Sequence, residues 1–357
     1  MTQRIQIAAV FIIIHLSFGY VVYPNLIYML TETAHWEVII CQGLLQLILI
    51  WVYMKGLNYF PAQNVIDIYL KMGRWAAIIF LTPFAFNLIV LASLNIRIHT
   101  EVIISIFLPR TPYWAILVLL FFISVYTALK GLGTILRSAI FIFLFVIPLV
   151  VLNIFSSAVN FNIHNVTPGL NLPPKFLLEM KFFYLLGFSS FLFLGFIASK
   201  TKLLFRQLFA AWAIVTLLSL SIVYIPLFIF GQDTVVTLKN PFLEAMDSID
   251  ISWFSFNRQA IFFGVLLVGL VILTSSVLFW MIGTIMQKVY KWNSSYWISA
   301  FSFIALIIAL VVPNKNLLEK YFLWSSGAQA FFMIIIPITI FIYGFWSNGG
   351  VRGHGEK

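Results

Sequence analysis

Long, nearly uninterrupted runs of apolar residues follow one another along the whole chain, separated by short polar segments. Most runs are about 20 residues long, which is the length an α-helix needs to cross the hydrocarbon core of a bilayer. Apolar and polar residues do not alternate within them, as they do in the strands of a membrane β-barrel. The pattern therefore predicts ten membrane-spanning helices, near residues 5–29, 36–55, 75–98, 113–130, 134–156, 181–199, 206–231, 258–286, 295–312 and 319–345.

The connections between these runs are mostly short, so we expect one transmembrane domain over residues 1–357. The fourth and fifth spans are separated by only Gly131-Leu132-Gly133. Two connections are longer, at about 157–180 and 232–257, and residues 241–243 of the second indicate a short surface helix. Neither connection is long enough to hold a soluble catalytic domain.

Composition and charge agree with a membrane protein. The 357 residues are 62% hydrophobic and only 9% charged, whereas about a quarter of the residues of a soluble domain are charged. The net charge of +10 comes from cations that stand singly or in pairs between apolar runs, which favours membrane topology over nucleic-acid binding. Lys and Arg are more numerous on the side of the N-terminus, and acids on the opposite side, so both termini are predicted to be cytoplasmic.

Two spans contain residues that interrupt a helix. Span one contains Gly19 and Pro24, and span six contains Gly187 followed by Phe188 and Ser189. Glycine lets the chain leave helical dihedrals, and proline removes an amide donor. Ten spans divide into two repeats of five, about 5–156 and 181–345, and many transporters bind their ligand where the first helix of each inverted repeat is broken. The alternative is that these glycines only permit close helix packing.

The end of span three resembles a known family. Arg97-x-x-x-Glu101, followed by the segment 107–112 (Phe-Leu-Pro-Arg-Thr-Pro), is similar to the spore germination permeases, the B subunits of GerA-type nutrient germinant receptors, within the amino acid–polyamine–organocation superfamily. Span one adds Gly19-x-x-x-x-Pro24, and span eight adds Thr274-Ser275-Ser276. The resemblance covers nearly the whole length, and it implies a LeuT-like fold of two inverted five-helix repeats with broken helices one and six.

The resemblance also implies a function. A protein of this family works with an A subunit and a lipoprotein C subunit in the inner membrane of a spore, binds a small nutrient such as an amino acid, and helps to trigger germination. Two departures touch the presumed ligand site: Ser17 stands where the family usually has glycine, and Ser189-Ser190 stand where it commonly has an acid.

We expect the nutrient-binding residues near mid-membrane in spans one, three, six and eight. They are Ser17, Gly19, Tyr20, Asn87, Leu91, Gly187, Phe188, Ser189, Thr274 and Ser275. Asn87 and Leu91 are four residues apart and share a helix face. The alternatives are an interhelical hydrogen bond for Asn87 and bonds to the preceding helical turn for Thr274 and Ser275.

Three ionisable groups have two interpretations each. Arg97 and Glu101 could form an outer gate or a structural ion pair. His15, inside span one, could couple protons or could hydrogen bond to a neighbouring helix.

No phosphate loop, thiol metal site or His-Glu-x-x-His pattern occurs in the sequence, so neither an enzyme nor a cofactor is expected. Besides the receptor subunit, two functions stay open: an ion-coupled amino acid transporter and a scaffold that only holds partner subunits.

Overall fold

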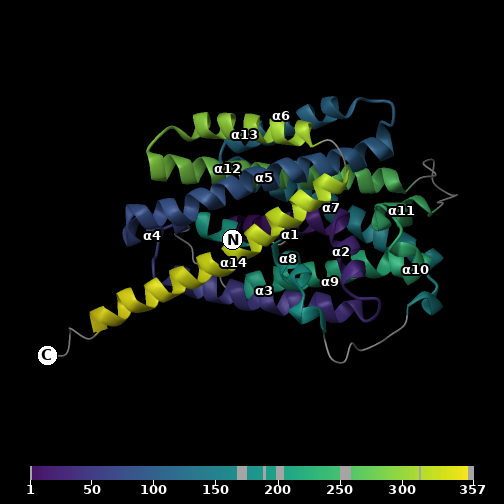
Figure 1. Ribbon diagram of the computed structural model, residues 1–357, viewed down its shortest axis with the longest axis horizontal. Coiled ribbons are helices and arrows are strands. Elements are labelled where there is room, and N and C mark those ends of the chain that lie inside the picture. Colours follow the sequence, from purple (N-terminus) through teal and green to yellow (C-terminus); the bar gives the residue numbers. More distant parts are fainter. Residues whose placement is uncertain are drawn as a thin grey trace.

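The chain folds as a bundle of helices in the computed structural model, which describes residues 2–166, 175–187, 190–197, 205–249, 259–312 and 315–352 (Figure 1). The α-helices are α1 (Thr2–Val21), α2 (Tyr23–Leu30), α3 (His35–Asn58), α4 (Val65–Met72), α5 (Arg74–Phe107), α6 (Tyr113–Leu129), α7 (Leu132–Ser157), α8 (Met180–Gly187), α9 (Phe205–Phe230), α10 (Gln232–Val235), α11 (Pro241–Asp247), α12 (Ala260–Tyr290), α13 (Ser294–Val311) and α14 (Lys315–Arg352). Short 3-10 helices are η1 (Ala158–Asn160), η2 (Ile163–Asn165), η3 (Lys175–Leu178) and η4 (Leu192–Phe196).

The predicted spans all correspond to helices of the structure. Within the part of the chain that the structure describes, eight helices are long and apolar enough to cross a membrane: α1, α3, α5, α7, α9, α12, α13 and α14. The fourth predicted span is α6, an apolar helix of 17 residues. The sixth begins with the eight-residue α8 and continues into η4. The all-helical fold predicted from the apolar runs is therefore confirmed.

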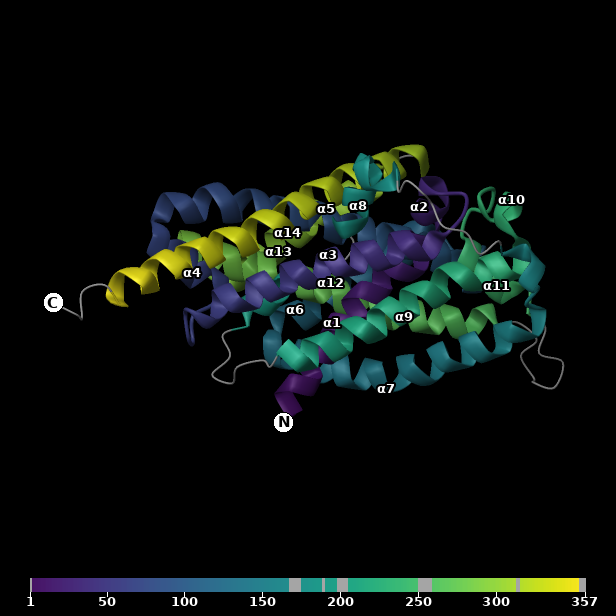
Figure 2. The ribbon, with the colours of Figure 1, turned by 90° about the horizontal axis from the view of Figure 1, so that it is seen from below.

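The helices form a layered bundle whose centre is made by α1, α5 and α12. These three helices have the most buried spans, whereas α7 and α13 have the least buried ones. Helix α12 packs along α5, and α6 and α13 cover that pair on one side (Figure 1). Helix α9 packs against both α1 and α3, and the long α14 crosses α3, α5 and α8 (Figure 2). This arrangement buries the polar side chains of α1, α5 and α12 at the centre of the bundle.

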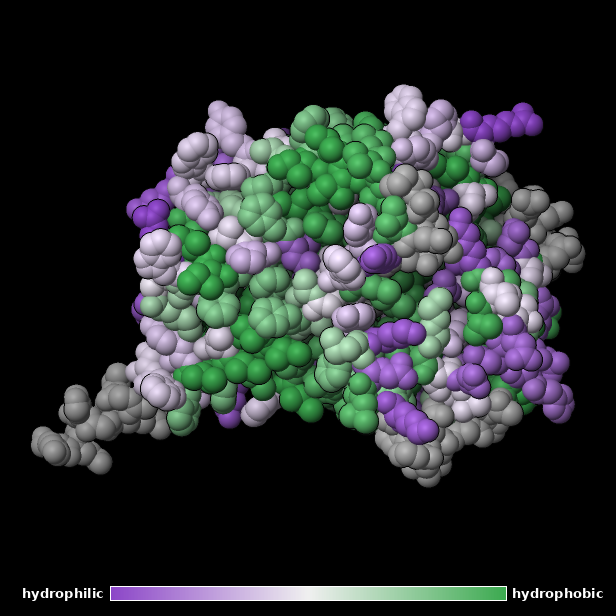
Figure 3. All heavy atoms as spheres, in the orientation of Figure 1, coloured by the Kyte–Doolittle hydropathy of each residue, from purple (hydrophilic) through white to green (hydrophobic). Residues whose placement is uncertain are grey.

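The bundle has two distinct ends. Helices α2, α10 and α11 lie at one, which we call the α11 end, and α4 and the last turns of α14 lie at the other, the α4 end (Figures 1 and 2). Apolar residues dominate the middle of the surface, and hydrophilic ones gather towards the α11 end (Figure 3). Exposed tryptophans occur near both ends: Trp36, Trp114, Trp324, Trp51, Trp75, Trp292 and Trp346. Tryptophan at these depths is typical of the two interfaces of a bilayer.

One predicted connection is shorter in the structure. Leu132 and Gly133 belong to α7, so only Lys130 and Gly131 separate α6 from α7. The backbone of Gly131 has φ of +83°, a left-handed conformation that glycine adopts without steric cost. This conformation allows the chain to reverse direction within two residues.

The short helix α4 is tied to the end of α12. Asn64 and Asp67 form a capping box at its start, with Asp67 N–H donating to Asn64 Oδ1 (3.0 Å) and Asn64 N–H donating to Asp67 Oδ2 (3.2 Å). Lys288 Nζ lies 2.7 Å from Asp67 Oδ1. Asp67 therefore both starts α4 and joins it to α12 through an ion pair.

Candidate functional site

The interruption of span one lies at Val22, between Gly19 and Pro24, the two residues that suggested it. Gly19 is helical, and a Cβ at this position would make only an ordinary contact with Ile222 at 3.6 Å. Val22, with φ of −121° and ψ of −34°, separates α1 from α2, and Pro24 lies in the first turn of α2. Proline is favoured in that position because it cannot continue a preceding helix but fits the start of a new one. Span one is thus interrupted, with Pro24 rather than Gly19 at the break.

The interruption of span six follows Gly187, the last residue of α8. A Cβ built on Gly187 would overlap the carbonyl group of Ser326 in α14. The chain resumes at Ser190 and forms η4 from Leu192 to Phe196. Phe188 and Ser189 lie outside the described residues. Gly187 is thus the last described residue of α8, and it permits close packing of α8 against α14.

Gln42 of α3 connects the two interrupted spans. The hydroxyl of Tyr23, the first residue of α2, donates to Gln42 Oε1. Gln42 Nε2 donates to the backbone carbonyl oxygen of Leu185, in the last turn of α8, over 2.7 Å. Gln42 is only 6% exposed. Loss of either hydrogen bond would leave its side-chain amide unpaired away from water, which costs stability.

A first polar network joins α1, α5 and α12. Ser17 Oγ donates to Asn95 Oδ1 (3.2 Å), and Asn95 Nδ2 donates to Ser275 Oγ (3.0 Å). Ser17 Oγ also lies 3.5 Å from Nε2 of His99, whose Nδ1 lies 2.8 Å from the carbonyl oxygen of Asn95. These four side chains are all buried. We call them the Asn95 network, and it brings together the predicted Ser17 and Ser275.

A second polar network joins α5, α14 and span six. Asn87 Nδ2 donates to Gln329 Oε1 (2.9 Å), and Ser325 Oγ donates to Asn87 Oδ1 (3.2 Å). Gln329 Nε2 in turn donates to Ser190 Oγ (3.3 Å), directly beyond the break in span six. The predicted Asn87 thus makes interhelical hydrogen bonds, and through Gln329 it is connected to that break. We call these residues the Asn87 network.

Leu91 lies between the two networks. Asn87, Leu91 and Asn95 follow one another at four-residue intervals and so share one face of α5. The two asparagines are about 12 Å apart along the helix axis at 1.5 Å per residue. Leu91 is 3% exposed, so its apolar side chain is buried between two groups of hydrogen-bonding side chains.

Two other predicted residues have different surroundings. Tyr20 packs edge-on against Phe242 of α11 and Phe263 of α12, with ring centroids 4.9 and 5.5 Å away. It therefore belongs to an aromatic cluster beneath α11. Thr274 is fully buried, and its hydroxyl has no hydrogen-bond partner among the described residues.

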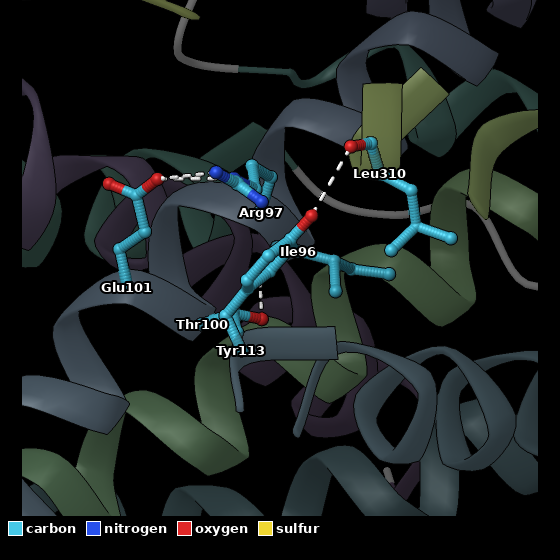
Figure 4. Close-up of polar contacts among 6 residues, drawn as sticks. All are labelled: Ile96, Arg97, Thr100, Glu101, Tyr113 and Leu310. Atoms are coloured by element: carbon cyan, nitrogen blue, oxygen red, sulfur yellow. Dashed lines mark hydrogen bonds and ion pairs between the residues drawn. The ribbon is translucent and has the colours of Figure 1, made fainter. Parts of the chain in front are cut away.

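Arg97 and Glu101 form the predicted ion pair at the α11 end of α5 (Figure 4). Arg97 Nε and Nη2 each lie 3.1 Å from Glu101 Oε1. The guanidinium group also stacks over the ring of Tyr113, 4.3 Å from its centroid, and the Tyr113 hydroxyl donates to the carbonyl oxygen of Leu310 at 3.3 Å. Arg97 therefore stabilises the contact between α5, the start of α6 and the end of α13.

His15 makes the hydrogen bond to a neighbouring helix that was one of its two interpretations. Its Nδ1 lies 2.6 Å from the carbonyl oxygen of Phe11 and its Nε2 lies 2.5 Å from Gln46 Nε2 of α3. The carbonyl requires a proton on Nδ1, and the Gln46 amide requires a lone pair on Nε2. Both ring nitrogens are therefore used in a neutral imidazole.

Several residues of the networks were not predicted. Asn95 and His99 continue the four-residue spacing of Asn87 and Leu91, so extending that face of α5 would have identified them. Ser325 and Gln329 are polar residues in an apolar span, which is itself a signal in membrane helices. Gln42 and Gln46 carry the same signal in α3.

A cavity of about 190 Å³ opens beside the α11 end of this region. It lies between α2, α5, α14 and the segment that joins α10 to α11, and Val21 and Val22 at the break of span one are part of its wall. A water molecule occupies about 30 Å³ in the liquid, so the cavity has room for a small organic molecule.

Comparison with known families agrees with this architecture. Residues 3–318 match the family model described as spore germination protein. The chain belongs to the spore germination protein family. The match covers α1 to α13 and therefore includes both breaks and all of α5 and α12.

Solved structures are also similar to this chain. MhsT, solved in complex with L-phenylalanine, has a TM-score of 0.67 and 12% sequence identity over 94% of this chain and 88% of that chain. Mhp1, a nucleobase-cation-symport-1 family transporter in a closed conformation with bromovinylhydantoin bound, has a TM-score of 0.61 and 13% identity over 88% of this chain and 74% of that chain. This chain thus has the LeuT-type fold. No curated protein matches it in sequence.

Proposed function

We propose that this chain is the B subunit of a spore nutrient germinant receptor, which binds a small nutrient such as an amino acid at mid-membrane and helps to trigger germination. Family membership over residues 3–318 supports the setting in germination. The observation that carries the binding role is the position of the two polar networks: the Asn87 network reaches the break in span six, and Ser17 of the Asn95 network lies five residues before the break in span one.

The proposed site lies around Leu91, between the two networks. Its candidate residues are Ser17, Gly19, Tyr20, Asn87, Leu91, Gly187, Phe188, Ser189, Thr274 and Ser275, and the geometry adds Asn95, Ser325 and Gln329. Amide and hydroxyl groups can exchange a partner in the protein for the ammonium or carboxylate group of a ligand. The unpaired hydroxyl of Thr274 offers one further donor.

The receptor interpretation places the α11 end outside the cell membrane and the α4 end in the cytoplasm, with both termini on the cytoplasmic side. Its partners are an A subunit and a lipoprotein C subunit in the spore inner membrane. In this interpretation the chain transmits nutrient binding to its partner subunits and does not accumulate the nutrient.

Spores with Asn87→Leu test this function. The measurement is germination as a function of nutrient concentration, with the abundance of the chain in the spore membrane checked by immunoblot. We expect a higher effective nutrient concentration at normal abundance. The matched control is Phe86→Leu, because Phe86 is the preceding residue of α5 but is 53% exposed on the outer surface of the bundle. If both variants respond like the natural chain, Asn87 has no part in the site, and the scaffold interpretation is favoured.

A second candidate is an ion-coupled amino acid transporter, since Mhp1 is a nucleobase-cation-symport-1 family transporter and MhsT was solved with L-phenylalanine. Proteoliposomes that contain only this chain decide between the two. Accumulation of an amino acid driven by a proton or sodium gradient supports the transporter, whereas binding without accumulation supports the receptor subunit.

A further inference from the structure

The start of α5 and the turn between α12 and α13 form a basic corner at the α4 end of the bundle (Figure 1). Arg74, the first residue of α5, is exposed. Lys291, in the turn, is also exposed, and its backbone has φ of +61°. Arg74 comes seven residues after Asp67, and Lys291 comes three residues after Lys288. Because Asp67 and Lys288 form an ion pair between α4 and α12, the two exposed cations flank that pair.

The protein does not neutralise the charge of this corner. Residues 64–96 and 259–312 contain four cations, Lys71, Arg74, Lys288 and Lys291, against the single acid Asp67. Asp67 is already paired with Lys288. Among the described residues, neither Arg74 nor Lys291 forms an ion pair. The corner therefore has a positive charge that a negatively charged group from outside the chain can neutralise.

An exposed apolar strip on α5 leads from this corner towards the middle of the membrane. Trp75 and Ile79 are 76% and 62% exposed, and Pro83 is also exposed. These residues follow one another at four-residue intervals and so lie on one side of α5. From Trp75 to Pro83 the strip is about 12 Å long at 1.5 Å per residue. This length fits within one leaflet, which is about half of the ~30 Å hydrocarbon core.

Aromatic rings of α12 and α13 border the strip. Thr82, next to Pro83, has its Oγ1 3.1 Å from the hydroxyl oxygen of Tyr290. The ring of Tyr290 lies 6.1 Å from that of Trp297 in α13, and Trp297 lies 5.8 Å from Trp292. Trp292, which follows Lys291 directly, is 66% exposed. The rings thus lead from the strip on α5 back to the cation in the turn, and tryptophan is typical of the headgroup level of a bilayer.

We propose that this surface, the α5–α13 groove, binds one phospholipid with a negatively charged headgroup from the leaflet at the α4 end. The phosphate group lies between Arg74 and Lys291. An acyl chain lies along Ile79 and Pro83, beside the ring of Tyr290. The proposal concerns a partner of the chain other than the nutrient and does not depend on the proposed function.

Other occupants use only part of the groove. A free phosphate ion would meet the two cations but would leave the apolar strip uncovered. A zwitterionic phospholipid would cover the strip but would place its ammonium group near Arg74 and Lys291, which repel it. A transmembrane helix of another chain would cover the strip without neutralising the cations, unless it supplied an acid at the same depth. A phospholipid with a net negative charge matches the cations, the interfacial rings and the strip together, as basic pockets between membrane helices do for acidic lipids.

Native mass spectrometry of the purified full chain, released from detergent, tests the lipid class. The probes are dioleoylphosphatidylglycerol and dioleoylphosphatidylcholine, which have the same acyl chains and differ in headgroup charge, and inorganic phosphate as competitor. We expect the first phosphatidylglycerol to bind at least about tenfold more tightly than the first phosphatidylcholine, because each lysine or arginine near the headgroups strengthens binding about fivefold. Inorganic phosphate should not displace it. Equal binding of the two lipids, or displacement by phosphate at equal concentration, overturns the proposal.

Two variants test the location. Arg74→Gln and Lys291→Gln should each weaken binding of phosphatidylglycerol about fivefold and leave that of phosphatidylcholine unchanged. Lys55→Gln is the matched control, because Lys55 is an exposed lysine in the last turn of α3 at the same end, held over the ring of Trp51 at 4.7 Å. It should bind phosphatidylglycerol like the natural chain.

The variants also distinguish a site from a general effect of charge. If Lys55→Gln weakens phosphatidylglycerol binding as much as Arg74→Gln and Lys291→Gln do, the lipid binds to the whole basic end, and the α5–α13 groove is overturned. Unchanged binding in both groove variants overturns it as well and leaves the strip for a helix of another chain. The spore measurement with Asn87→Leu decides the proposed function in either case.

Discussion

Gly187 faces the backbone carbonyl group of Ser326 so closely that no side chain fits between α8 and α14. This contact fixes the end of α8 against the helix that carries Ser325 and Gln329. The break in span six and the Asn87 network are thus held in place by the same helix, α14.

Replacement of Gly187 by alanine should therefore destabilise the protein, whereas the same change at Gly19 should not. Overpacking of this kind costs about 1–3 kcal/mol, because α8 and α14 would have to separate. A Cβ at Gly19 meets only Ile222 at 3.6 Å, and Gly19 is helical, so alanine there should be neutral or slightly stabilising. Thermal unfolding in detergent measures both variants. Equal unfolding temperatures for Gly187→Ala and Gly19→Ala would contradict the close approach of α8 and α14.

Replacement of Asn95 by leucine should destabilise the centre of the bundle by about 1–2 kcal/mol, the usual contribution of interhelical hydrogen bonds in membranes. It leaves the hydroxyl groups of Ser17 and Ser275 without their amide partner. The triple variant that combines Asn95→Leu with Ser17→Ala and Ser275→Ala should lose less stability than the three single variants lose in sum. The hydroxyl groups that Asn95→Leu would leave unpaired are absent from it. Unfolding of all variants in one detergent gives the comparison. Strict additivity would show that Asn95 does not act through these serines.

Replacement of Asp67 should have two separable effects at the α4 end. Asp67→Asn keeps an oxygen that accepts from the Asn64 amide but loses the ion pair with Lys288. The two side chains of this ion pair are about one-third exposed. Such a pair contributes about 0.2–1 kcal/mol. Asp67→Ala loses the cap as well and should cost about 1 kcal/mol more. High salt should lower the free energy of unfolding of the natural chain but not that of Asp67→Asn, because salt screens the ion pair. A loss of equal size in both variants would assign the whole effect to the ion pair.

Replacement of Gln42 by leucine should change the nutrient response, if the proposed function holds, because Gln42 holds α2 and α8 together through Tyr23 and Leu185. We expect a shifted effective nutrient concentration at normal abundance in the spore membrane. Leu44→Met serves as the control, since Leu44 is on the same helix but is 48% exposed. A normal response of Gln42→Leu would mean that the two interrupted helices act independently of this link.

The apolar runs were enough to predict an all-helical membrane fold, because a bilayer demands about 20 apolar residues per helix whatever the packing. They placed the break in span one only between Gly19 and Pro24, because its exact position depends on where Pro24 fits the first turn of a new helix. Asn87 was recognised as a polar residue in an apolar span, but its partner Gln329 is 242 residues away. Local patterns contain no information on which helices meet, so the networks became visible only in the fold.

One helix links three of the regions described above. Phe322 of α14 lines the cavity at the α11 end, Gln329 hydrogen bonds to Asn87 at the centre, and Thr339 hydrogen bonds to Tyr69 of α4. At 38 residues, α14 is longer than the roughly 20 residues that cross the hydrocarbon core of a bilayer. A single continuous helix therefore joins the two ends of the bundle through its centre.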